Sequence, residues 1–216
     1  MIVSDNTLSL FPESELPSGT DVLFYESMAR RAGFHFIAGV DEAGRGPLAG
    51  PVVAAAVILP EGAVLNGVRD SKAMTAKARE EAFSLVITTS LAIGVGVVSA
   101  KHIDESNILR ASLDAMKKAI LCLDPAPDLV LVDGTYPVPV PTPHRCLVGG
   151  DRISLSVSAA SVVAKVYRDR IMRSYHPMYP QYGFLENKGY GTAAHLAAIK
   201  ANGACPIHRM SFRGVA

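Results

Sequence analysis

Apolar residues occur along this chain in short runs and in one helical stripe. Residues 36–40, 52–59 and 91–98 are runs with many β-branched residues, and a glycine-rich segment at 42–51 separates the first two, so three strands are predicted. Between 109 and 123, apolar residues recur at steps of four and three, which predicts a helix with one buried face: Leu109, Leu113, Met116, Ile120 and Leu123. We expect this helix to cover the sheet.

The second half of the chain alternates the same kinds of element. Residues 128–132 are nearly all apolar, as in a strand buried on both faces, and 145–148 predict another short strand. Residues 156–172 predict a helix whose small residues permit close packing, and Thr192 could cap a last helix that Gly203 ends. The class is therefore α/β with a mixed sheet flanked by helices.

Three regions follow from this pattern. Residues 1–33 form an N-terminal tail with a short helix ended by Gly33, residues 34–178 form the main α/β domain, and residues 179–216 form a small helical extension. The length of 216 residues and the 49% of hydrophobic residues fit one globular domain with a core and a small appendage.

Cysteine content and hydropathy bear on the compartment. Three widely spaced cysteines without a CxxC pair indicate neither a disulfide framework nor a zinc site, and so favour a reducing compartment. The first residues do not resemble a signal peptide, and no stretch reaches the roughly 20 apolar residues that a membrane span needs. We expect a cytoplasmic protein without a membrane partner, and a monomer.

The net charge of +1 conceals an asymmetry along the chain. Residues 1–143 hold 11 Lys and Arg against 17 Asp and Glu, a net of −6, whereas residues 144–216 hold 10 against 3, a net of +7. A basic C-terminal third could neutralise nucleic-acid phosphates, although a solvated helix face has the same composition.

Asp41 and Glu42 end the first apolar strand and face the glycine-rich segment. Neighbouring side chains of a regular strand point to opposite faces, so we expect the backbone to break here if both acids serve one site. Gly44 and Gly46 would supply that freedom and leave backbone N–H groups uncovered. An Asp-containing turn with an exposed glutamate is the simpler interpretation of this pair alone.

Two further acids follow apolar runs. Asp133 comes after the strand at 128–132, where it could also cap a helix or lie in a turn, and Asp151 comes after the strand at 145–148. Active sites of α/β sheets lie outside strand ends, and four gathered carboxylates would repel one another without bound cations. Oxygen donors suit Mg²⁺ or Mn²⁺, and two ions would support phosphoryl displacement by water.

Longer motifs make a specific resemblance. The chain contains DEAGRGPLAGPV, DSK at 70–72, LVDG, GD followed by SAASVVAKVYRDR, then NKGYGT and HRMSF, in this order between Gly39 and Phe212. This series resembles the bacterial ribonuclease HII family. The resemblance implies a ribonuclease-H-like fold and a metal-dependent endonuclease that cuts the RNA strand of RNA–DNA hybrids and DNA duplexes containing ribonucleotides. The chain has Gly149 and Asn187 where the family often has Lys and His, and Ala73-Met74 where Lys-Leu is commoner.

The resemblance also implies roles for single residues. The catalytic and metal-binding acids would be Asp41, Glu42, Asp133 and Asp151, with products carrying a 5′-phosphate and a 3′-hydroxyl. The backbone of Gly44, Arg45 and Gly46 would contact a ribose 2′-hydroxyl, the group that distinguishes RNA from DNA. Tyr190 would contact the same hydroxyl and pack on the next sugar.

Several basic and hydroxyl residues have two interpretations. Lys72, Lys165 and Arg168 could hold phosphates, but Lys165 and Arg168 would equally suit a solvated face or an ion pair with Asp169. Ser158 and Ser161 have no His–Asp partners and suit close helix packing better than nucleophilic catalysis. Two alternatives to the nuclease stay open: a catalytically silent nucleic-acid-binding protein of the same fold, and another metal-dependent phosphoryl-transfer enzyme.

Overall fold

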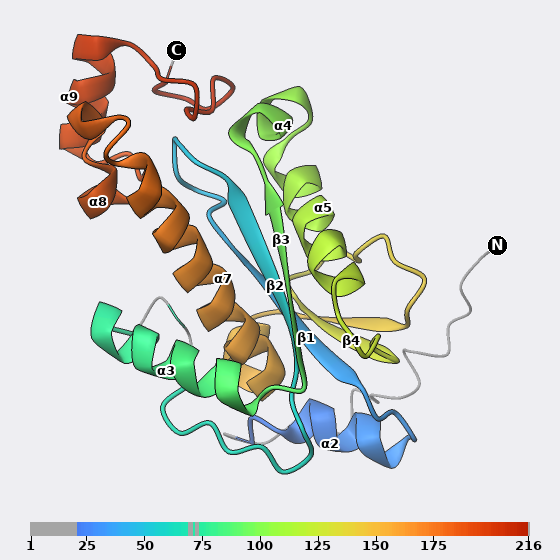
Figure 1. The fold of residues 1–216 in the computed structure, drawn as a ribbon. Coiled ribbons are helices and arrows are strands. Elements are labelled where there is room, and N and C mark those ends of the chain that lie inside the picture. Colours follow the sequence, from blue (N-terminus) through green and yellow to red (C-terminus); the bar gives the residue numbers. More distant parts are fainter. Residues whose placement is uncertain (1–20, 69–70, 72–73, 216) are drawn as a thin grey trace.

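The computed structural model describes residues 21–68, 71 and 74–215, and Lys72 therefore lies outside the described residues. Five strands form one mixed sheet in the order β3-β2-β1-β4-β5, in which β1 pairs antiparallel with β2 and parallel with β4 (Figure 1). The strands are β1 (Ile37–Ala43), β2 (Val52–Ile58), β3 (Ala92–Val98), β4 (Leu129–Asp133) and β5 (His144–Leu147). Each predicted strand is present, so the mixed α/β fold is confirmed.

The described helices lie on both faces of the sheet and near both of its ends (Figure 1). They are α2 (Phe24–Arg31), α3 (Ala76–Thr89), α4 (Ala100–Glu105), α5 (Ile108–Leu121), α6 (Gly150–Ile153), α7 (Leu155–Tyr175), the 3₁₀ turn η2 (Pro180–Tyr182), α8 (Phe184–Asn187) and α9 (Ala193–Asn202). Thr192 accepts a hydrogen bond from the His195 N–H as the predicted N-cap of α9, and Gly203 follows its last residue. Within the described chain, each helix is too short or too polar to cross a membrane.

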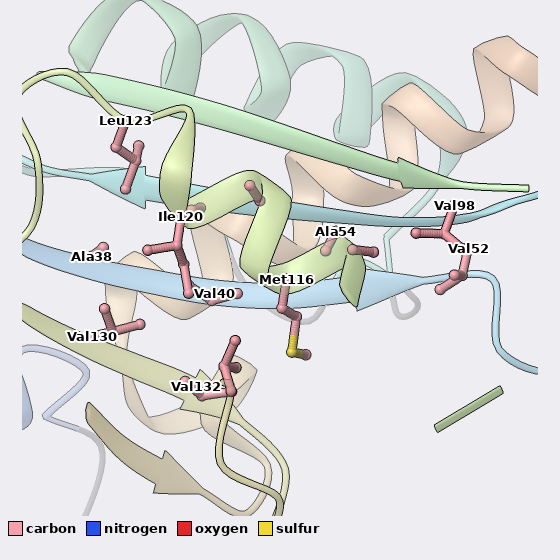
Figure 2. Packing of buried hydrophobic residues seen from close by; sticks show 14 of the residues in the cluster. Ala38, Val40, Val52, Ala54, Val98, Met116, Ile120, Leu123, Val130 and Val132 are labelled. Carbon is pink, nitrogen blue, oxygen red and sulfur yellow. The ribbon is translucent and has the colours of Figure 1, made fainter. Parts of the chain in front are cut away.

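Helix α5 covers one face of the sheet, as its apolar stripe predicts. Met116 and Ile120 of α5 form one buried cluster with Val40 of β1 and Val132 of β4, and Leu123, just after the helix, belongs to the same cluster (Figure 2). All five side chains are at most 6% exposed. Burial of such aliphatic side chains contributes about 1.5–3 kcal/mol each, so this contact fixes the helix against the central strands.

Helix α7 lies against the other face, with its first turn on β1. Its small residues let the backbones meet there: a Cβ on Gly39 would come within 2.1 Å of the Ser156 carbonyl carbon. Any side chain at position 39 would therefore force α7 away from the sheet. This contact places the serines of α7 beside the end of β1.

The C-terminal segment packs on the far end of α7 (Figure 1). Phe184, Tyr182 and Ile199 form an apolar cluster with Met172 of α7 and Leu48 of the loop after β1. The loop between β1 and β2 is thus held between α7 and the extension, which brings residues near 190 and 209 to the same end of the sheet as Asp41.

Candidate active site

Asp41 and Glu42 are both inside β1. The antiparallel ladder with β2 continues through Asp41–Ala55, Glu42–Ala54 and on to Ala43, so the expected break of the backbone at the acidic pair is wrong. Ladder hydrogen bonds hold the strand straight, and the glycine-rich loop begins one residue after it ends.

The two side chains consequently face opposite ways. Asp41 is 2% exposed and forms a hydrogen bond with Ser161 of α7. Glu42 lines a hollow of about 260 Å³ on the α5 side, together with Ser112 and Asp133. The end of β1 thus presents one carboxylate to each face of the sheet.

Asp133 is the last residue of β4 and comes level with Asp41, because the parallel register pairs Val132 with Val40. One of its carboxylate oxygens accepts the Gly150 N–H at 2.7 Å. Asp151 follows in the first turn of α6 and is 6% exposed. Asp151 thus comes after β5, as the sequence predicts, but it lies in a short helix, because Gly149, with φ of 68°, turns the chain into α6 first.

Electrostatics connect these acids. Burial raises the pKa of Asp41 well above its ordinary value, and repulsion from Glu42 and then Asp133 raises it further. Hydrogen bonds from Ser161 and the Glu42 N–H act in the opposite direction. Three negative groups therefore act on one another at the end of β1 and β4, and a bound cation would relieve their repulsion.

These oxygen donors suit a divalent cation by their chemistry, but among the described residues their side chains are not close enough together to coordinate one. Within the described residues, no three His, Cys, Asp or Glu side chains stand close enough together to hold a metal ion. The reason lies in the strand geometry, which separates Asp41 from Glu42, and in the 3.2 Å contact of Glu42 with Arg45. Carboxylates of this kind prefer hard ions such as Mg²⁺ or Mn²⁺.

The loop after β1 meets Tyr190. Gly44 has φ of +101°, a region that favours glycine, and a Cβ on Gly46 would lie 3.9 Å from Cε1 of Tyr190. The tyrosine is 44% exposed, with the Lys165 ammonium 5.7 Å from its ring centroid. The structure therefore brings together the loop and the tyrosine that the sequence placed in one site.

A chain of two buried histidines supports the backbone at Tyr190. The Cys205 N–H donates to Nδ1 of His208, Nε2 of His208 lies 3.0 Å from Nε2 of His195, and Nδ1 of His195 lies 2.9 Å from the Tyr190 carbonyl. Only one assignment satisfies every contact: His208 donates to His195, which donates to Tyr190, and both rings are neutral.

Known proteins are similar to this chain along nearly its whole length. The family model described as Ribonuclease HII matches residues 38–215. Two curated proteins named Ribonuclease HII, from Geobacter sulfurreducens and Geotalea uraniireducens, are 55% and 53% identical to this chain, and each match covers 97% of it and 95% of the relative. The chain belongs to the ribonuclease HII family. It is therefore a type 2 ribonuclease H, a hydrolase and endonuclease that acts on nucleic acid and depends on divalent metal ions.

Solved structures agree with the ribonuclease HII fold. The crystal structure of ribonuclease H2 from Pyrococcus horikoshii has a TM-score of 0.69 and 29% identity, covering 83% of this chain and 94% of that one. The ribonuclease HII in a complex with PCNA from Archaeoglobus fulgidus has a TM-score of 0.70 at 24% identity, covering 82% and 95%, and supports the fold alone.

In this ribonuclease HII family member, two of the basic residues considered for phosphate binding have other partners. Lys165 pairs with Asp169 at 2.8 Å, the ion pair that the sequence left open. Arg168 is 0% exposed and bonded to backbone carbonyls, so it cannot contact a phosphate from this position. Ser158 and Ser161 are both buried at the helix–sheet contact.

Sequence reasoning missed the role of Arg209. It belongs to the HRMSF motif quoted for the ribonuclease HII resemblance, but received no function there. Its side chain is 0% exposed and donates hydrogen bonds to the carbonyls of Gly44, Arg45 and Gly50. An arginine next to a histidine in a basic C-terminal segment carries no signal that distinguishes this contact from a solvated one.

Proposed function

We propose that Asp41, Glu42, Asp133 and Asp151 are the catalytic and metal-binding acids of this ribonuclease. The observation that carries the proposal is the placement of Asp41 and Asp133 level with each other at the ends of β1 and β4, where burial and then repulsion from Glu42 and Asp133 raise the pKa of Asp41. Burying like charges is costly unless cations compensate them. Two Mg²⁺ or Mn²⁺ ions are the compensation that this all-oxygen set suits.

The reaction proposed is attack of water on a phosphodiester, which breaks the bond between phosphorus and the 3′-oxygen and leaves a 5′-phosphate and a 3′-hydroxyl. Divalent ions, when bound, stabilise the charge that develops on the phosphoryl group. The chain's own contribution is orientation: Ser161 and the Glu42 N–H hold Asp41, while the Gly150 N–H holds Asp133 at 2.7 Å.

The substrate proposed is an RNA–DNA hybrid, or a DNA duplex containing ribonucleotides, cut on the 5′ side of the ribonucleotide. Backbone groups of Gly44, Arg45 and Gly46 and the side chain of Tyr190 would contact the ribose 2′-hydroxyl. The closeness of Gly46 to the Tyr190 ring supports this role, because both could reach one sugar. Lys72 is proposed to hold a backbone phosphate.

The regional division fits this function. We propose that residues 34–178 form the catalytic domain and residues 179–216 a substrate-binding extension of a monomer, with residues 1–33 as the N-terminal tail and short helix. Tyr190 lies in that extension, and the extension packs on Leu48 and Ala49 of the loop after β1.

A cleavage assay tests the proposal. A labelled DNA duplex with one ribonucleotide is incubated with Mg²⁺ or Mn²⁺, and with the Asp41→Asn variant in parallel. We expect incision on the 5′ side of the ribonucleotide, lost with chelator and in the variant. Absence of cleavage with both metals would exclude the nuclease and leave a silent nucleic-acid-binding protein. Equal cleavage of an all-DNA duplex would contradict the role of the loop and Tyr190.

A further inference from the structure

Two buried arginines, Arg168 and Arg209, lie under the loop that follows β1. Both side chains are 0% exposed, which is rare for a charged residue. Every side-chain hydrogen bond that the structure gives them ends on a backbone carbonyl. The charges of Asp104 and Asp169 act on them only from a distance, without a hydrogen bond. Removing two cations from water without a hydrogen-bonded carboxylate is costly, so a purely packing role would be served better by apolar side chains.

Arg209 donates hydrogen bonds to the loop at the residues proposed to contact the 2′-hydroxyl. Its two terminal nitrogens donate to the Gly44 carbonyl at 2.6 Å and the Arg45 carbonyl at 2.9 Å, and its Nε donates to the Gly50 carbonyl at 3.0 Å. One planar guanidinium thus fixes both ends of the loop. Its fork geometry sets the direction of each carbonyl, which a lysine ammonium would not do.

The direction of these carbonyls determines where the loop's N–H groups point. In a trans peptide unit, the C=O and the N–H point to opposite sides of the chain. Because the Gly44 and Arg45 carbonyls turn toward Arg209, the N–H groups of Arg45 and Gly46 turn away from it. Within the described residues, neither N–H donates to a protein acceptor, so both are available to a ligand.

Arg168 joins the same loop to the Tyr190 segment. It donates to the carbonyls of Ala49 and Pro51 at 3.1 Å each and to that of Lys188 at 3.0 Å. Its guanidinium carbon lies 5.9 Å from the Tyr190 ring centroid. The loop and the tyrosine are therefore fixed to one rigid group from α7.

We propose that Arg168 and Arg209 are positioning residues that aim the Arg45 and Gly46 N–H groups and the Tyr190 ring at the ribose of the substrate. They determine specificity for a 2′-hydroxyl without touching the substrate themselves. The proposal rests on the proposed function of the loop and Tyr190, and it goes beyond it by naming what holds those groups in place.

The test measures how strongly the protein prefers a duplex containing a ribonucleotide over an all-DNA duplex, rather than the rate of cleavage. Dissociation constants are determined for a duplex with one ribonucleotide and for the same duplex made only of DNA, using wild type, Arg209→Lys and Arg168→Lys. We expect the ratio of the two constants to fall about tenfold in each variant, the size of one or two misdirected hydrogen bonds. Affinity for the all-DNA duplex should stay unchanged, because phosphate contacts are not affected.

Arg30→Lys is the matched control. Arg30 also donates to two backbone carbonyls, those of His35 and Leu59, but at the opposite end of β1 and β2. We expect its ratio to equal that of wild type. A general loss of rigidity would lower affinity for both duplexes, and would not change the ratio selectively.

The outcomes separate the two proposals. If wild type does not distinguish the duplexes, the proposed function of the loop and Tyr190 fails. If wild type distinguishes them and both lysine variants keep its ratio, the positioning role alone is overturned. Circular dichroism checks folding, and Arg168→Lys serves if Arg209→Lys does not fold. Failure of both to fold would also contradict the proposal, because it would assign the arginines to overall stability.

Discussion

The acidic end of β1 and β4 and the loop of residues 44–51 lie next to each other but are built in opposite ways. The first presents carboxylates that repel one another, and burial and then this repulsion raise the pKa of Asp41. The second presents backbone groups whose carbonyls are held by Arg168 and Arg209. Negative charge dominates the first region, where, among the described residues, Arg45 pairs with Glu42 alone, and the second contains two buried guanidinium groups. We infer that the acids need bound cations to offset their repulsion, whereas the loop has its conformation before any ligand binds.

The largest effect should come from Asp41→Asn, which separates activity from stability. We expect cleavage of the ribonucleotide duplex to fall about a thousandfold, as for loss of a principal charge-stabilising group. Without metal, the variant should melt at a higher temperature than wild type, because a neutral amide removes the repulsion from Glu42 and Asp133. Thermal melting in chelator checks this, and a lower melting temperature would contradict the account of repulsion.

Gly44→Ala tests whether the loop is organised in advance. The residue has φ of +101°, and an added Cβ would come within 2.1 Å of the Arg168 Nε. We expect the free energy of unfolding to fall by about 2 kcal/mol or more. Gly33→Ala is the control, because Gly33 has φ of +97° and no atom within 4 Å of the added Cβ. Equal losses in denaturant unfolding would show that the Arg168 contact does not matter.

Acid should weaken the support of Tyr190 through the histidine pair. Burial and then His195 lower the pKa of His208 to about 4, from an ordinary value of 6.5. The unfolded chain therefore binds more protons between these values, so stability falls as the pH drops from about 6.5 to about 4. The loss is about 3 kcal/mol.

The pH prediction is checked by unfolding wild type and His208→Gln across this range. The difference between the two proteins should shrink as the pH falls, and taking this difference cancels the titration of Asp41. His35→Gln, which changes an exposed residue, is the control. A constant difference from pH 7 to pH 4 would contradict the neutral pair.

The smallest effect should come from Tyr190→Phe. The ring would keep its place beside Gly46, and only the hydroxyl would be lost. We expect kcat/KM on the ribonucleotide duplex to fall about tenfold, as for one hydrogen bond to substrate. Tyr167→Phe, on the exposed side of α7 near Phe83, should leave the rate unchanged. Equal rates for Tyr190→Phe and wild type would remove the hydroxyl from recognition.

The sequence alone predicts those helices and strands whose apolar residues recur at regular intervals. Helix α5 and the run before Asp133 were placed correctly, because burial on one helix face or on both sheet faces imposes a regular pattern. Of the predicted stripe, however, Leu109 and Leu113 are only half-buried, and Leu123 lies just after the helix. Helix α3 was not predicted. Its sequence ends in Val86, Ile87 and two threonines, which are typical of strands, and contact with α7 outweighs that preference.

The candidate site, too, could be predicted only in part. Its acids could be named from the sequence because each follows an apolar strand, yet their directions could not: β1 runs straight through Asp41 and Glu42, and α6 begins before Asp151. Arg209 contacts residues more than 150 positions away from it in the chain, among them Gly44 and Gly50. No local pattern encodes a bond to a distant carbonyl, and the structure was needed to find it.

The most direct test of the central claim moves the ribonucleotide. A set of otherwise identical DNA duplexes carries one ribonucleotide at successive positions, and the cleavage products are sized to a single nucleotide in the presence of Mg²⁺ or Mn²⁺. If the loop and Tyr190 direct the acids by reading a 2′-hydroxyl, the incision moves with the ribonucleotide and stays on its 5′ side. Incision at fixed positions, or at the same rate in the all-DNA duplex, would contradict the account.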